Sequence, residues 1–339
     1  MHLQTPIITL FMILSKFSYI VEPLDQTNSE HYYHVHDGRL MKTKHQHFGD
    51  ITRTNRDNLF SSKSRGMVNV DDFGAKADGR DDRETCNDEP RPQAVTFHGC
   101  KNLRVKNIRF KDAQKMHVSF ERCFNVFVSN LVVRAPENSP NTDGIHVTET
   151  QNIHITSCDI GTGDDCISII SGSKNVQATN ITCGPGHGIS IGSLGRDNTE
   201  AEVSNVIVNK ATLKGTKNGV RIKTWQGGSG YARNIKFMDI EMQNVTNPII
   251  IDQSYCDQTK PCKEQNKGVQ LSHVLYQNIS GTSASEVAIT FECSKIVRCK
   301  QVYLQDVILE QEGSGGTTAT CKNVKYVNTG KFYPQCSPL

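Results

Sequence analysis

A short phrase that recurs at nearly constant spacing between residues 141 and 223 constrains the fold of this chain most. Its members are Asp143-Gly-Ile-His-Val, Asp165-Cys-Ile-Ser-Ile, His187-Gly-Ile-Ser-Ile and Asn218-Gly-Val-Arg-Ile. The first three begin 22 residues apart and the fourth follows after 31. A step of this size is typical of a solenoid, in which each coil stacks on the preceding one. Because stacked strands lie about 4.8 Å apart, side chains far apart in sequence can meet on neighbouring coils.

A second series of β-rich phrases extends the repeat along the chain. These phrases begin at Asn102, Asn125, Asn152, Asn175, Asn205 and Asn234, and weaker repeats cover 269–279, 287–291 and 302–309. Each alternates apolar and polar residues, which is the period of a strand with one buried face, and no run keeps a helical period. An asparagine at each corner tolerates left-handed geometry, and stacking would align these residues into a ladder. The sequence therefore predicts an all-β parallel β-helix. A β-sandwich is the alternative, but its hairpin turn signals are scarce.

The same alternation predicts which side chains face out of the solenoid. The aliphatic positions of the phrases, such as Ile145 and Ile167, should fill the interior. The outward positions are His146, Ser168, Ser190, Arg221 and Lys223, with Asp143, Asp165 and His187 at the strand entrances. Together with Asp164, they include three neighbouring carboxylates, which is more than one general acid and one general base require. Their mutual repulsion should raise the pKa of at least one aspartate.

In this order, the motifs Asn141-Thr-Asp, Gly163-Asp-Asp, Gly186-His-Gly and Arg221-Ile-Lys resemble the plant polygalacturonases, the pectin-hydrolysing enzymes of glycoside hydrolase family 28. The resemblance covers residues 68–83 and nearly everything from about residue 90 onward. It implies a right-handed parallel β-helix, which agrees with the handedness of parallel crossovers. It also implies inverting hydrolysis of the α-1,4 bonds between galacturonates in pectin.

The resemblance also implies roles for individual residues. Asp164 resembles the proton donor, Asp143 and Asp165 the pair that positions and deprotonates water, and His187 the residue that tunes the acid. The residues that resemble the family's substrate-binding groups are Arg221, Lys223 and Tyr255. Arg221 and Lys223 suit a galacturonate carboxylate. Ser254 stands where the family more often has Asn, which is a small departure.

The resemblance is interrupted near residues 86–90. In the family, a capping helix and several coils follow the opening strand. Here Cys86 is followed almost at once by a phrase that resembles a segment well inside the family's solenoid. On the order of a hundred residues, about four coils, are absent. This departure leaves open the alternative that the chain is a catalytically inactive paralogue, which either binds pectin or has decayed. A calcium-dependent pectate lyase is a further alternative, because aspartates on a β-helix can bind calcium, but His187 beside Gly-Asp-Asp does not resemble that family.

Several features indicate secretion. We assign residues 1–21 to a signal peptide because 6–14 is an apolar run too short to span a bilayer, with a disordered tail as the alternative. Residues 22–66 are polar and histidine-rich, and we interpret them as a disordered pro-region or linker in preference to a metal-binding tract. Residues 67–339 should form one β-helix domain. The glycosylation sequons are Asn180-Ile-Thr, Asn244-Val-Thr and Asn278-Ile-Ser.

Twelve cysteines fit an oxidising compartment. Local bridges are plausible between Cys256 and Cys262, Cys293 and Cys299, and Cys321 and Cys336, although sequence does not fix connectivity and buried free thiols are the alternative. Cys166 is expected to be a packed side chain and not a nucleophile, because no histidine stands next to it in the motif.

Charge and motifs limit the partners that we expect. The net charge of +3 comes without a Lys/Arg block, which argues against nucleic acid. We expect polygalacturonate as partner and neither cofactor nor metal. We also expect a soluble monomer, secreted to the extracellular space and cell wall, that does not bind membranes.

Overall fold

The computed structural model describes residues 93–257, 262–313 and 315–336, with the backbone of three short strands at 22–23, 31–36 and 39–44. The strands are β1 (Glu22–Pro23), which lies antiparallel to β5, and β2 (His31–His36) with β3 (Arg39–Lys44), which form an antiparallel pair. The assigned signal peptide and the interruption near 86–90 lie outside the described residues, so the domain boundaries stay predictions. No helix in the described part has the length and apolar character needed to cross a bilayer.

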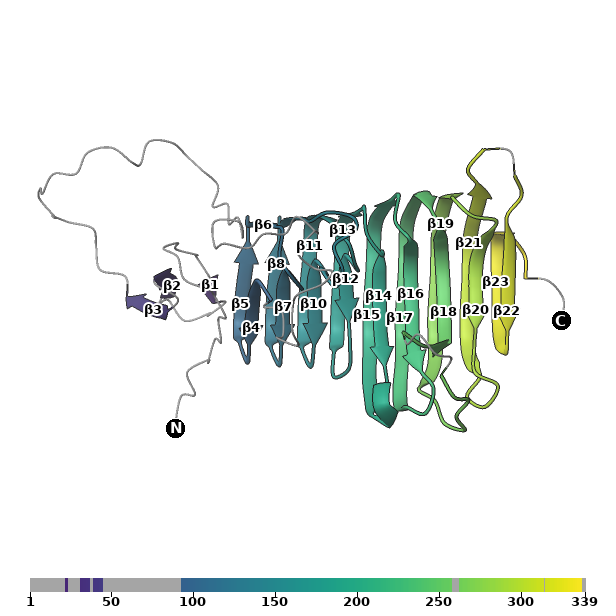
Figure 1. The fold of residues 1–339 in the computed structure, drawn as a ribbon, viewed down its shortest axis with the longest axis horizontal. Helices are drawn as coiled ribbons and strands as arrows, with labels where there is room; N and C mark the ends of the chain where they lie inside the picture. The colour runs from purple at the N-terminus through teal and green to yellow at the C-terminus, as the bar shows by residue number, and fades with distance from the viewer. Residues whose placement is uncertain are drawn as a thin grey trace, which may run out of the picture.

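Two large sheets make up the described body, and the chain crosses between them in every coil (Figure 1). Sheet 1 contains β1, β5 (Lys101–Lys106), β6 (Arg109–Lys111), β8 (Phe124–Ser129), β9 (Val132–Arg134), β11 (Gln151–Gly161), β13 (Lys174–Cys183), β15 (Glu200–Lys214), β17 (Ser229–Val245), β19 (Gln270–Ser283), β21 (Cys299–Gln311) and β23 (Val324–Tyr333). Sheet 2 contains β4 (Val95–His98), β7 (Val118–Glu121), β10 (Ile145–Thr148), β12 (Ile167–Ile169), β14 (Ile189–Leu194), β16 (Asn218–Trp225), β18 (Asn247–Tyr255), β20 (Val287–Glu292) and β22 (Thr318–Lys322).

Every neighbouring pair in these two sheets is parallel except β1 with β5. The described part contains a single helical element, the short 3-10 turn η2 (Arg196–Asn198). The predicted fold class, an all-β right-handed parallel β-helix, is confirmed.

The interior is filled by aliphatic side chains in register, as the alternation predicts. Ile145 pairs with Ile167, which pairs with Ile189, and Val220 continues the row. All four are fully buried. A coil cannot bury this apolar face alone, so stacking of successive coils creates the core.

The asparagine ladder that the sequence predicts runs across the strands of sheet 1, from β5 to β17. Each of the six residues has a left-handed backbone, with φ between 53° and 58°. Amide hydrogen bonds of 2.7–3.1 Å link these asparagines across successive coils: Asn125 to Asn102, Asn175 to Asn152, Asn205 to Asn175 and Asn234 to Asn205. A second left-handed row, which includes Asn107, Asn130 and Asn180, was not predicted.

All three expected local disulfides are present: Cys256–Cys262, Cys293–Cys299 and Cys321–Cys336. Cys166 is buried as expected, but it is bonded to Cys183. This bridge joins the entrance of β12 in sheet 2 to the end of β13 in sheet 1. Its sequence separation of 17 residues is close to the 15 of Cys321–Cys336, so it was missed because Cys166 was interpreted only as a packed side chain.

Candidate active site

Four neighbouring strands of sheet 2, β10, β12, β14 and β16, bring the motif residues together. Their register places Asp143, Asp165, His187 and Asn218 in one row, each two residues before a buried aliphatic position. Glycine follows at three of these entrances because the coils approach closely there. A Cβ on Gly188, whose φ is +84°, would lie 2.1 Å from the carbonyl oxygen of Asn218.

Asp165 lies at the centre of the cluster and is almost completely buried. Its Oδ2 accepts a hydrogen bond from Lys223 Nζ at 3.0 Å. Its Oδ1 accepts hydrogen bonds from Ser190 Oγ at 2.7 Å and from Arg221 Nη2 at 3.0 Å. Arg221 Nε also donates to Ser190 Oγ at 3.1 Å, so the serine links the cation to the carboxylate. Two cations thus compensate a charge that burial alone would make costly.

Asp164 is more accessible and contacts the histidine. Its Oδ1 lies 3.0 Å from Nδ1 of His187 and accepts the backbone N–H of Asp165 at 2.8 Å. Burial acts to raise the pKa of Asp164, but the hydrogen bond from His187 and the charge of a protonated imidazole outweigh it. The pKa of Asp164 is therefore lowered.

Asp143 has the opposite environment. Burial, followed by the negative charges of Asp165 and Asp164, raises its pKa from 3.8 to about 7. Ser168 opposes this shift through a hydrogen bond to the carboxylate, and Ser168 Oγ in turn lies 2.7 Å from Nδ1 of His146. The sequence predicted that repulsion raises the pKa of at least one aspartate. The shift of Asp143 has this direction, but burial is its larger cause. The two shifts thus have opposite directions: the pKa of Asp143 is raised, whereas the pKa of Asp164, the donor suggested by the resemblance, is lowered.

The outward side chains of the motif strands are less accessible than the alternation suggests. His146, Ser168, Ser190 and Lys223 point away from the aliphatic interior, yet all are buried. Burial lowers the pKa of His146 to about 4, so its imidazole is neutral over the physiological range. The serines were recognised only as outward positions. Their contacts with the carboxylates depend on side-chain rotamers, which the spacing of the repeat does not determine.

Tyr255 lies beside the cluster, at the end of β18. Lys223 Nζ is 5.4 Å from the centroid of its ring. Trp225 meets the same ring edge-on, and Arg196 lies over Trp225 at 5.2 Å. The structure thus brings all seven predicted site residues together. It adds Trp225 and Arg196, which no motif indicated.

Asp164, Asp165 and His187 offer potential metal ligands within 4.8 Å of one another in the described part of the chain. Arg221 and Lys223 already donate to both oxygens of Asp165. A divalent cation would have to compete with these two charges, so the donor set fits a compensated carboxylate better than a metal centre.

Comparison with known proteins agrees with the geometry. Residues 50–332 match the family described as "Glycosyl hydrolases family 28". The chain is 58% identical over 248 residues to Polygalacturonase-2 of Solanum lycopersicum, which covers 73% of this chain and 54% of that protein. It is 60% identical over 247 residues to Polygalacturonase QRT2 of Arabidopsis thaliana, covering 73% of this chain and 56% of the relative. The chain thus spans about half the length of these curated relatives.

Among solved structures, an endo-xylogalacturonan hydrolase from Aspergillus tubingensis superposes with a TM-score of 0.67 at 23% identity. The superposition covers 78% of this chain and 74% of that one. At this identity the likeness supports the fold alone.

Proposed function

This chain belongs to the glycosyl hydrolases of family 28, and from that premise we propose that it hydrolyses the α-1,4 bonds between galacturonates in pectin. The observation that carries the proposal is the meeting of three aspartates with His187, Arg221 and Lys223 on adjacent coils. The high identity to plant polygalacturonases over the shared region supports the same reaction.

In the proposed mechanism, Asp164 protonates the leaving oxygen, and Asp143 with Asp165 position and deprotonate the attacking water. An inverting reaction needs one carboxylic acid and one carboxylate base. Asp164 is the most exposed of the three, since 21% of its side chain is accessible, and it can therefore meet the glycosidic oxygen. His187 orients the acid through its Nδ1 contact.

Substrate binding supplies a reason for the proton to move to Asp164. Arg221 and Lys223 suit a galacturonate carboxylate, because a guanidinium and an ammonium form charge-assisted bonds with it. Such a ligand adds a negative charge and competes for the cations that compensate Asp165. Both effects raise the pKa of carboxyl groups nearby. Because the carboxyl groups interact, a proton favoured on Asp143 by its raised pKa can then be shared within the cluster.

The partner and location follow from the same proposal. The substrate is polygalacturonate, and the site of action is the cell wall outside the cell. The alternative of an inactive pectin-binding protein is favoured only by the length of the chain relative to its relatives. The lyase alternative is disfavoured by the pairing of Asp165 with two cations.

Asp164→Asn is the decisive variant. It keeps the size of the side chain but cannot donate a carboxyl proton, so release of reducing ends from polygalacturonate should fall by about 100-fold or more. Asp159→Asn, which alters an exposed aspartate on β11, should keep full activity. The wild-type chain should be assayed as secreted, folded protein under mildly acidic conditions.

Three outcomes separate the candidates. Loss of hydrolysis in Asp164→Asn with retained binding of polygalacturonate supports the proposal. A folded wild-type protein that binds but releases no reducing ends would be an inactive pectin-binding protein. Products that absorb in the ultraviolet and require calcium would identify a lyase.

A further inference from the structure

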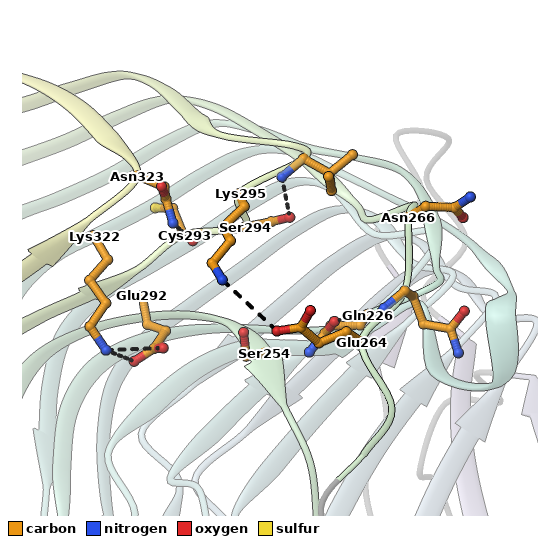
Figure 2. Close-up of a pocket in the computed structure, with 12 residues that line it drawn as sticks. Gln226, Ser254, Glu264, Asn266, Glu292, Cys293, Ser294, Lys295, Lys322 and Asn323 are labelled. Carbon is orange, nitrogen blue, oxygen red and sulfur yellow. Dashed lines mark hydrogen bonds and ion pairs between the residues drawn. The ribbon is translucent and has the colours of Figure 1, made fainter.

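One row of outward side chains crosses the four strands of the candidate site. His146 pairs with Ser168, Ser168 with Ser190, and Ser190 with Arg221. The histidine and the two serines are each at most 9% exposed. Farther along the same sheet the polar side chains are open to solvent: Figure 2 shows a polar pocket in which Lys322, 52% exposed, pairs with a glutamate. Buried polar groups must find their partners within the protein, so the contacts of the row at the site are fixed.

At one end of this row, a serine links a charged group to a carboxylate. Ser190 Oγ donates to Asp165 Oδ1 at 2.7 Å and accepts from Arg221 Nε at 3.1 Å. Asp165 stands two residues before Ile167 of β12, and Ser190 stands one residue after Ile189 of β14, with which Ile167 pairs. The serine of one coil thus contacts the aspartate of the preceding coil.

The same relation recurs one coil earlier. Asp143 stands two residues before Ile145 of β10, and Ser168 stands one residue after Ile167, with which Ile145 pairs. Ser168 accordingly makes a hydrogen bond to the carboxylate of Asp143. Its Oγ also lies 2.7 Å from Nδ1 of His146. An imidazole therefore takes the place beside this serine that a guanidinium takes beside the other one.

The donors and acceptors along these contacts determine the tautomer of His146. Burial lowers the pKa of His146 to about 4 and keeps the imidazole neutral, so one ring nitrogen donates and the other accepts. The hydroxyl of Ser168 has a single proton, and an ionised Asp143 can only accept. Ser168 therefore donates to the carboxylate, and it accepts from Nδ1–H of His146.

We propose that His146 and Ser168 are positioning residues for Asp143. Nδ1–H of His146 fixes the hydroxyl of Ser168, and that hydroxyl holds the carboxylate of Asp143 in the orientation in which it receives a proton from the attacking water. A neutral pair stabilises the ionised carboxylate less than a cation would, so the carboxylate stays basic enough to take up this proton. The inference rests on the proposed function, because it assigns the means by which one of the carboxylates in that reaction is oriented.

The kinetics of single and double variants test this role. Ser168→Ala and His146→Leu should each lower kcat on polygalacturonate about tenfold or more and leave KM within about twofold, because both act on the reacting step and not on substrate binding. His146→Asn has an amide nitrogen at the same distance along the side chain as Nδ1, and it should restore kcat to within about threefold of the parent. The double variant Ser168→Ala with His146→Leu should lose no more than Ser168→Ala alone, because His146 acts through the serine. Ser173→Ala is the matched control: it removes another buried hydroxyl, which donates to the backbone of β10, and should keep kcat.

The pH profile separates positioning from packing. Ser168 stabilises the ionised form of Asp143, which is the form that accepts a proton, so loss of the hydroxyl raises the pKa of that carboxyl. The acidic limb of kcat/KM should therefore move to higher pH by about 0.5–1 in Ser168→Ala and stay in place in Ser173→Ala. The charged groups that face the histidine and the carboxyl are the same in both variants: Lys115, Glu121, Asp164, Asp165 and Lys223.

Nuclear magnetic resonance tests the pair without turnover. The ring nitrogen resonances of His146, identified by their absence from His146→Asn, should show the Nδ1–H tautomer at pH 8, above the pKa of Asp143. The carboxyl carbon of Asp143 should titrate at higher pH in Ser168→Ala than in the parent. A proton on Nε2 at pH 8, equal titration of Asp143 in the two proteins, or additive losses of kcat in the double variant would overturn the proposal. A parent chain that hydrolyses nothing would contradict the proposed function, and the tautomer and the titration would still decide whether the pair holds Asp143.

Discussion

Three aspartates within one small cluster have different properties because their neighbours differ. Asp165 receives hydrogen bonds from Lys223, Arg221 and Ser190, whereas Asp164 faces His187. Asp143 is buried beside both carboxylates, and no cation lies within ion-pair distance of it among the described residues. The chemical identity of the residue therefore does not determine its protonation; its coil and its partners do.

This contrast predicts how Asp143 affects stability. Its pKa is raised from 3.8 to about 7 by burial and by the neighbouring carboxylates. Between these values the unfolded chain has released the proton while the folded protein keeps it, so stability falls as pH rises and becomes level above about pH 7. Asp143→Asn removes this dependence and should be more stable than the parent at pH 8 by about 1–3 kcal/mol.

Urea unfolding at pH 4, 6 and 8 measures the effect. The advantage of Asp143→Asn should grow across this series, while Asp159→Asn, at an exposed ion pair with Arg134, should show no such growth. A variant that is less stable than the parent at pH 8 would contradict the assignment.

The motifs specified the residues of the site but not the hydrogen bonds and ring contacts between their side chains. Asp143, Asp165 and His187 could be placed in one row, because a repeat of 22 residues predicts the stacking. The hydrogen bonds of Ser190 and Ser168, and the contact of Trp225 with Tyr255, were not predictable. They depend on side-chain rotamers and on loops of unequal length, which carry no periodic signal.

At the scale of the element, equivalent strands of four successive coils together carry the site. Strand positions in sheet 2 and the asparagine corners of sheet 1 followed from period-2 alternation and from a recurring asparagine. The bridge between Cys166 and Cys183 did not, because it crosses the coil between two sheets. It fixes the entrance of β12, where Asp164 and Asp165 lie.

Removing this bridge should impair both stability and catalysis. Cys166→Ala with Cys183→Ala should lower the free energy of unfolding by about 2–4 kcal/mol. It should also lower kcat, because Asp165 is adjacent to Cys166 and loses its fixed position. Cys321→Ala with Cys336→Ala, in the last coil, should lower stability and leave kcat unchanged. Thermal unfolding and initial rates on a short oligomer test both pairs; equal effects on kcat would show that the first bridge has no special role at the site.

At the scale of the whole molecule, strand length and the number of disulfides differ between the two ends of the solenoid. Strands β4 to β10 have three to six residues each, whereas β15, β17, β19 and β21 have 13 to 17 (Figure 1). None of the four described disulfides involves a residue before Cys166. Longer strands contribute more hydrogen bonds and more buried apolar surface per coil. The candidate site, on β10, β12, β14 and β16, extends from the region with short strands into the rest of the solenoid.

This gradient predicts the order in which the solenoid opens. In a stacked array each coil is stabilised mainly by its immediate neighbours, so the region with short strands and no covalent closure should open first. Backbone amides in β5 and β8 should exchange with solvent about tenfold or more faster than those in β17 and β19. Native-state hydrogen exchange read by mass spectrometry tests this expectation. Reduction of the disulfides should narrow this difference in exchange rate, because the described disulfides constrain only the coils from Cys166 onward, which exchange more slowly. Equal exchange rates in all coils before reduction would contradict the gradient. They would mean that the solenoid opens as one cooperative unit, in which the coils of the site are as stable as the coils that follow them.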